Sequence, residues 1–154
     1  MMVERKMVGG HPVIEIADPL MTKLEVMPVN TYAGWYGDNG LDTLPGLQWN
    51  VPVDKPLIFS EFGADALAGY FDPAATHKFS EDYQTQYSRK TLEMAGQIPN
   101  LRRMSSWILK DIRSPRREHP VFKNGWNRKG LLSETGERKQ AFEVLAKHYE
   151  DKSN

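Results

Sequence analysis

The chain has 154 residues, enough for one domain with a substantial core or for part of a larger domain. Its 20 basic and 20 acidic side chains cancel, so no broad field is expected to attract nucleic acid or an anionic membrane surface. The absence of cysteine excludes disulfides and thiolate metal sites and favours a reducing, cytoplasmic location. No apolar segment suggests a signal peptide or a membrane span.

The first third of the chain predicts one short helical turn, one strand and a long loop. Asp18 before Pro19 is typical of a helix start, with the aspartate as the capping residue. Residues 25–32 are predicted as a strand, in which Pro28 indicates an edge position or a bulge. Residues 33–54 are rich in glycine and proline and predict a loop with at most a short helix near 41–49. Such a long connection is usually functional.

A second strand is predicted at residues 57–61. Its apolar run is short and lies between Pro56 and Gly63, which is typical of a fully buried parallel strand. Glu61 ends the run, so its carboxylate is expected at the rim of the sheet. Two interpretations remain open at this point: a functional carboxylate, or a strand-end glutamate that is only solvated or paired with a cation.

Two helices and a third strand complete the prediction. Ser80 is the expected cap of a helix that ends before Pro99. A strand is predicted at residues 104–109 and a last helix at 137–150. The order strand, loop, strand, helix, strand, helix favours an α/β fold with a parallel sheet and right-handed crossovers. Three strands cannot close an eight-stranded barrel, which needs roughly 250 residues.

Four motifs lie along the chain in a fixed order: Asn-Thr-Tyr-Ala-Gly-Trp-Tyr at 30–36, Ser-Glu-Phe-Gly-Ala-Asp at 60–65, Ser-Trp at 106–107 with Asp111, and Asn-Arg-Lys-Gly at 127–130. Their order and spacing resemble the carboxy-terminal part of glycoside hydrolase family 2 catalytic barrels. That family contains β-glucuronidases, β-galactosidases and β-mannosidases. The resemblance covers residues 12–149 and implies a partial (β/α)8 TIM barrel comprising strands six to eight with their helices. Residues 1–154 would then be the carboxy-terminal portion of a catalytic domain, with no second domain.

The resemblance also implies roles for individual residues. Glu61 matches the catalytic nucleophile, which forms a covalent glycosyl ester that water hydrolyses with retention. Asn30 and Tyr32 match the polar pair beside that nucleophile. Trp107 matches the tryptophan that forms part of the sugar pocket, where its flat face suits ring C–H bonds.

The last motif implies the substrate. In β-glucuronidases the pair that matches Asn127 and Lys129 recognises the carboxylate of glucuronic acid, which an amide and an ammonium group suit. Lys123 falls where those enzymes can place a further cation.

Simpler interpretations of the same residues stay open. Asn30 and Tyr32 alternate onto one side of a strand, where they could bond each other. Trp107 could be a core residue, and Asn-Arg-Lys-Gly could be an ordinary turn. The four histidines share no ligand spacing, so neither a metal nor another cofactor is expected.

One part of the family pattern is missing. A retaining glycosidase needs a second carboxyl group about 5 Å from the first, and the family places it in an Asn-Glu pair that does not occur in this sequence. We therefore expect a retaining β-glycosidase fragment, most similar to β-glucuronidases, that is inactive as an isolated chain. The alternatives are a β-galactosidase-type member or a catalytically inert fragment. The expected partners are a β-glucuronide or β-galactoside substrate and either an amino-terminal barrel half or a second copy.

Overall fold

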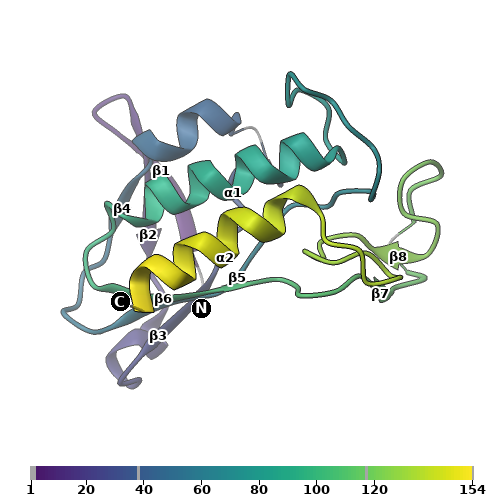
Figure 1. Ribbon diagram of the computed structural model, residues 1–154. Coiled ribbons are helices and arrows are strands. Elements are labelled where there is room, and N and C mark those ends of the chain that lie inside the picture. The colour runs from purple at the N-terminus through teal and green to yellow at the C-terminus, as the bar shows by residue number, and fades with distance from the viewer. Residues whose placement is uncertain (1–2, 38, 117, 154) are drawn as a thin grey trace. The chain divides into compact units, whose positions relative to one another are not determined.

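The computed structural model describes residues 3–37, 39–116 and 118–153 (Figure 1). Contacts within the chain divide it into two compact units. Unit 1 holds the residues up to 62 together with 90–106, and unit 2 holds 63–89 together with the residues from 107 onward. Within the described ranges, no helix is long and apolar enough to cross a membrane.

Unit 1 begins with a β-hairpin that the sequence analysis missed. Strand β1 (Val3–Val8) pairs antiparallel with β2 (His11–Ile16), and β2 pairs in parallel with β4 (Gln48–Asn50). Gly9 and Gly10 form the turn with φ of 58° and 82°. Two successive left-handed residues suit a two-residue hairpin, so the Gly-Gly pair was the available signal.

The second sheet of unit 1 is parallel, as predicted. Its order is β3 (Met27–Asn30), β5 (Leu57–Phe62) and β6 (Leu101–Ser106), which lie side by side in Figure 1. Among the described residues these strands form an open sheet and not a closed barrel. The strand predicted at 104–109 was placed too late, because the chain enters β6 directly from a left-handed turn at Asn100. Trp107 therefore follows the strand instead of lying in it.

The proline in β3 is accommodated in the two ways that were expected. β3 lies at the edge of its sheet, and its register with β5 shifts between Val29 and Asn30. An edge strand tolerates the N–H that Pro28 lacks. Along β5 buried and partly open residues alternate, with Leu57 and Phe59 fully buried, so one face of this sheet supplies the core of unit 1.

Short 3-10 helices occupy the connections of unit 1. Asp18 caps η1 (Pro19–Thr22), because its Oδ1 accepts the N–H of Leu20 at 2.9 Å. Helix η2 (Leu41–Gly46) is the short helix predicted in the long loop. Lys55 donates to three backbone carbonyls at the end of η1, with Nζ to oxygen distances between 2.8 and 3.0 Å. These contacts tie η1 to the entrance of β5.

The two α-helices begin differently from each other. Ser80 caps α1 (Glu81–Ala95) as predicted, since its Oγ accepts the N–H of Tyr83 at 3.1 Å. Helix α2 (Gln140–Ser153) starts three residues later than predicted. In unit 2, Glu81 accepts the N–H of Gln140 at 2.8 Å, so the first residue of α1 caps the start of α2.

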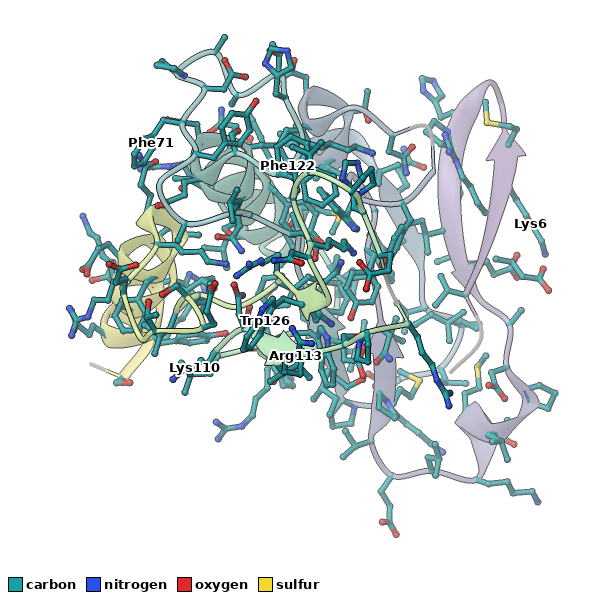
Figure 2. The ribbon with its side chains drawn as sticks, turned by 90° about the vertical axis from the view of Figure 1, so that its right-hand side faces the viewer. Lys6, Phe71, Lys110, Arg113, Phe122 and Trp126 are labelled. Atoms are coloured by element: carbon teal, nitrogen blue, oxygen red, sulfur yellow. The ribbon has the colours of Figure 1, made fainter. Side chains whose placement is uncertain are left out.

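A two-stranded ribbon in unit 2 positions Asn127. β7 (Ile112–Arg113) pairs antiparallel with β8 (Trp126–Asn127). The Arg113 guanidinium lies 5.2 Å from the centre of the Trp126 ring; both side chains are labelled in Figure 2. This cation–π contact adds to the short ribbon and fixes the residue before Asn127.

We predict that Phe59→Ala lowers the free energy of unfolding by about 3–5 kcal/mol, because the ring is 1% exposed and packs 5.1 Å from the Trp49 ring centre. Phe59→Leu should cost less, because it leaves a smaller cavity. Urea denaturation of the full chain measures both. Arg103→Ala, at an exposed position of β6, should change stability little. Equal losses at positions 59 and 103 would contradict the assigned core.

A loop carboxylate in unit 2, that of Asp72, makes the stability of the fold depend on pH. Asp72 Oδ2 accepts the N–H groups of His77 and Thr76 at 2.8 and 2.7 Å. These bonds, led by that of His77, lower the pKa of Asp72 to about 2. The stabilisation is therefore complete above the ordinary value near 4 and is lost as the pH falls through about 2.

We predict that the stability difference between the wild type and Asp72→Asn is largest at pH 5 and shrinks steadily toward pH 2. Denaturant unfolding of both proteins at several pH values measures it. A difference that stays constant over this range would show that the Asp72 carboxylate does not make these bonds in solution.

Candidate functional site

In unit 1 the structure brings together the three predicted site residues that lie on β3 and β5 and just after β3. Glu61 is the next-to-last residue of β5 and is half-buried. Tyr32 donates its hydroxyl to Glu61 Oε2 at 2.7 Å. The N–H of Thr31 donates to the Glu61 carbonyl at 2.9 Å. The parallel register thus brings the chain after β3 against the end of β5 and gives the carboxylate a fixed donor.

Asn30 lies beside this carboxylate. It is the register partner of Glu61 across the two strands. Its Oδ1 accepts the hydroxyl of Ser60 at 2.7 Å. Asn30 and Tyr32 therefore each bond a residue of β5. The Glu61 carboxylate thus has one polar partner in Tyr32 and a second polar side chain, Asn30, beside it.

The other predicted site residues, Trp107, Asn127 and Lys129, belong to unit 2. Trp107 opens a segment that runs against the chain at 129–131, where Ile108 donates to the Lys129 carbonyl at 3.2 Å and accepts from Leu131 at 3.0 Å. The Trp107–Ile108 peptide is cis. A Cβ at Gly63 would collide with the Trp107 carbonyl oxygen. The glycine that follows β5 is therefore required for this close approach.

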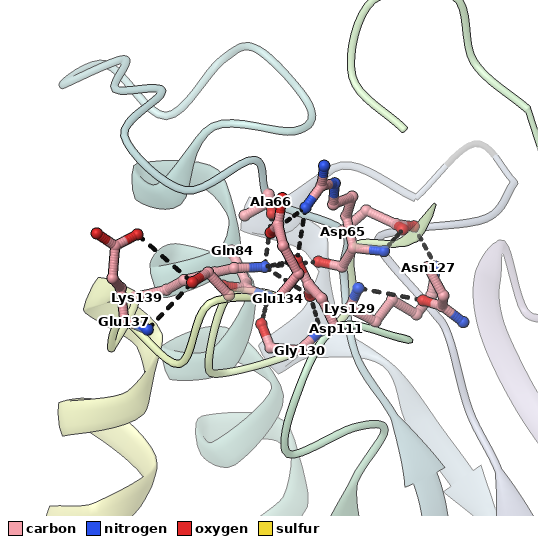
Figure 3. Close-up of polar contacts among 12 residues, drawn as sticks. Asp65, Ala66, Gln84, Asp111, Asn127, Lys129, Gly130, Glu134, Glu137 and Lys139 are labelled. Atoms are coloured by element: carbon pink, nitrogen blue, oxygen red, sulfur yellow. Dashed lines mark hydrogen bonds and ion pairs between the residues drawn. The ribbon is translucent and has the colours of Figure 1, made fainter. Parts of the chain in front are cut away.

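Asn127 and Lys129 form a compact turn. Asn127 Oδ1 accepts the Lys129 N–H at 3.1 Å, so the amide nitrogen is the end of Asn127 that suits an acceptor on a ligand. The Lys129 side chain is only 1% exposed, and its ammonium pairs with Asp65 Oδ2 (Figure 3). The predicted carboxylate-binding lysine thus already holds a carboxylate of its own chain.

Next to this turn lies a second buried ion cluster, seen in Figure 3. Lys139 Nζ donates to Asp111 Oδ1 at 2.9 Å and to the carbonyls of Ala66 and Arg128 at 2.6 and 3.0 Å. Arg128 also contacts Asp111 at 3.2 Å, and it pairs with Glu134. Burial raises the pKa of Asp111 and lowers the pKa of Lys139. Their mutual contacts oppose both shifts.

The sequence analysis gave no role to Asp65, Asp111 or Lys139. The two aspartates stand inside the motifs that carry the resemblance, so their motif positions were a signal. Lys139 fell within the helix predicted at 137–150, so nothing in the sequence indicated that it would lie in a cluster of charged groups. Its side chain is fully buried and its contacts with Asp111 and two carbonyls keep residue 139 out of α2. Metal ligation has no candidate in the described ranges, where no group of three or more His, Cys, Asp or Glu residues could hold an ion.

The chain is similar to known β-glucuronidases over part of their length. No protein-family model matches it. It is 28% identical to a β-glucuronidase of Streptococcus agalactiae over 89% of this chain and 24% of that protein. It is 41% identical to the β-glucuronidase of Rattus norvegicus over 40% of this chain and 10% of that protein. The chain thus spans a quarter or less of the curated relatives that it matches.

Solved structures give the same picture. A GH2 β-galacturonidase from Eisenbergiella tayi, bound to galacturonate, superimposes with a TM-score of 0.68 and 26% identity, over 82% of this chain and 24% of that one. A Faecalibacterium prausnitzii β-glucuronidase superimposes with a TM-score of 0.72 over 90% of this chain and 24% of that one; at 22% identity this likeness supports the fold alone. The mixed α/β arrangement therefore aligns with one part of such enzymes.

We predict that Gly130→Ala destabilises the chain by about 1–3 kcal/mol. A Cβ at this position would collide with the backbone nitrogen and carboxylate of Asp111 and with the Leu132 carbonyl. Gly46→Ala is the matched control, because nothing lies within 4 Å of its Cβ position. Denaturant unfolding measures both. A Gly130→Ala protein as stable as the control would contradict the packing of the 127–130 turn.

Proposed function

Because the chain is related to the β-glucuronidases of glycoside hydrolase family 2 over a region that spans about a quarter of their length, we propose that it is the nucleophile-bearing part of a retaining β-glycosidase of the β-glucuronidase type. One observation carries the proposal. The carboxylate at the end of the central parallel strand, Glu61, accepts a hydrogen bond from Tyr32 at 2.7 Å. Strand-end carboxylates of this kind do the chemistry in barrels of parallel strands.

In the proposed reaction Glu61 attacks the anomeric carbon of a β-glycoside. A bond forms between its carboxylate oxygen and that carbon while the glycosidic C–O bond breaks and the aglycone leaves. Water then hydrolyses the ester, and two inversions give net retention. The leaving oxygen takes its proton from a second carboxyl group, whose Asn-Glu signature these 154 residues do not contain.

The remaining site residues take supporting roles. We assign β3, β5 and β6 to strands six, seven and eight of the barrel. Tyr32 holds the nucleophile through its hydroxyl, and Asn30 lies beside the nucleophile, where it would meet the sugar hydroxyls. Trp107 offers its ring face to the sugar.

The substrate class follows from the turn in unit 2. Asn127 and Lys129 provide an amide donor and an ammonium group, which together suit a carboxylate. Similar proteins include a β-glucuronidase and a β-galacturonidase bound to galacturonate, and both names refer to uronic acid derivatives. We therefore propose a uronic acid glycoside as the substrate, and we rank a β-glucuronide above the other uronic acid glycosides.

Two alternatives have an observation in their favour. Lys129 is buried against Asp65, which is how a purely structural lysine would look, and this favours a β-galactosidase-type member that keeps the turn for folding. The missing Asn-Glu pair favours a catalytically inert chain.

We predict that 2-deoxy-2-fluoro-β-glucuronyl fluoride labels the full chain once, at Glu61. Fluoride leaves without a proton donor, and the fluorine at C2 slows hydrolysis of the ester, so the trap needs only an organised nucleophile. Intact mass spectrometry and peptide mapping measure the adduct. Glu61→Gln should remain unlabelled.

Comparing glucuronyl and galactosyl fluorides as labelling reagents distinguishes the proposed function from its two alternatives. Labelling by the galactosyl fluoride and not by the glucuronyl fluoride would replace the proposed substrate with a β-galactoside. No adduct from either reagent would identify the chain as inert.

A further inference from the structure

Asp65 is a buried carboxylate that the proposed reaction does not use. Its side chain is 0% exposed and lies four residues after Glu61. A buried carboxylate is expensive unless cations or hydrogen bonds compensate it. The groups that compensate the buried charge of Asp65 therefore indicate the role of this residue.

Two lysines share this one carboxylate. Oδ2 pairs with the Lys129 ammonium, and Oδ1 lies 3.4 Å from the Lys123 ammonium. Oδ1 also accepts the Arg128 N–H at 3.0 Å. Asp65 therefore holds the ammonium groups of both lysines and the backbone between Asn127 and Lys129.

The neighbouring ion cluster has its own pairs of cations and carboxylates. Its two carboxylates, Asp111 and Glu134, are contacted by Arg128, and Asp111 also by Lys139. Two cations and two anions balance there. At Asp65, by contrast, two ammonium groups share one carboxylate.

Lys123 is the more accessible of the two lysines, with 12% of its side chain exposed. Its loop is held by aromatic packing, because Phe122, which is labelled in Figure 2, stacks on Phe79 with ring centres 4.8 Å apart. The Lys123 ammonium lies 5.9 Å from the centre of the Phe79 ring. The second cation thus has a fixed place as well.

We infer that Asp65 is a positioning residue for the carboxylate site. It holds the ammonium groups of Lys123 and Lys129 in fixed places beside the turn that would contact a ligand carboxylate. This inference rests on the proposed function, since it explains how the Asn127 and Lys129 turn selects a monoanionic sugar over a neutral one. Removing Asp65 leaves two like charges that repel each other, so the ammonium of Lys129 loses its place.

The test compares the binding of methyl β-D-glucuronide and methyl β-D-glucoside by calorimetry in four full-length chains: wild type, Asp65→Asn, Lys129→Met and the double variant. Asparagine keeps the shape and the acceptor for the Arg128 N–H but not the charge. Wild type should prefer the glucuronide. Asp65→Asn should lower that preference by about tenfold or more. In the Lys129→Met background the same change should have no further effect, because Asp65 acts through Lys129.

The ratio of the two affinities separates a loss of positioning from general damage to the fold. General damage would weaken the binding of both sugars equally. Denaturant unfolding of the same four proteins gives a second readout, in which the double variant should lose less stability than the two single variants combined. Asp72→Asn, in an exposed loop of the same unit, is the control and should keep the preference.

Each outcome is decisive. A wild-type chain without any preference for the glucuronide overturns the proposed substrate, and this inference with it. A wild-type preference that survives Asp65→Asn overturns the inference alone. An additive stability cycle would show that Asp65 and Lys129 are not paired in solution.

Discussion

The polar part of unit 2 depends on one buried ion pair, between Lys139 and Asp111. The Lys139 ammonium also donates to the carbonyls of Ala66 and Arg128, so one cation joins residues that lie 11, 28 and 73 positions away from it in the sequence. Desolvating both charges is costly, and only this complete set of partners makes the burial tolerable. The turn that carries Asn127 and Lys129 is fixed by the same group. The proposed anion site would thus be built on a scaffold in which cations and carboxylates are already paired.

Unit 1 uses a different means to place its functional groups. Parallel strands end at the same edge of a sheet, so β3 and β5 deliver Asn30 and Glu61 to neighbouring positions without any buried charge. The register shift before Asn30 lets Tyr32 follow with its hydroxyl on the carboxylate. Backbone pairing therefore organises this half of the proposed chemistry, and ion pairing organises the other.

Local signals in the sequence predicted most of the fold. The buried run of β5, the caps at Asp18 and Ser80 and the parallel order depend on neighbours in sequence, and the structure confirms them. The errors arose where distant contacts decide. Residues 137–139 were predicted as helix, but α2 begins at Gln140, and Lys139 is buried against Asp111 and two carbonyls. The cluster at Glu61 followed from strand register, whereas the Asp65 partner of Lys129 lies 64 positions away and left no local pattern.

The phenol of Tyr32 makes the two oxygens of Glu61 chemically unequal. Oε2 accepts the hydrogen bond of the Tyr32 hydroxyl at 2.7 Å, so it is the poorer donor of an electron pair. If Glu61 attacks a sugar, the new ester grows from Oε1. One aromatic side chain would then determine from which direction an anomeric centre can arrive, before any pocket wall touches it.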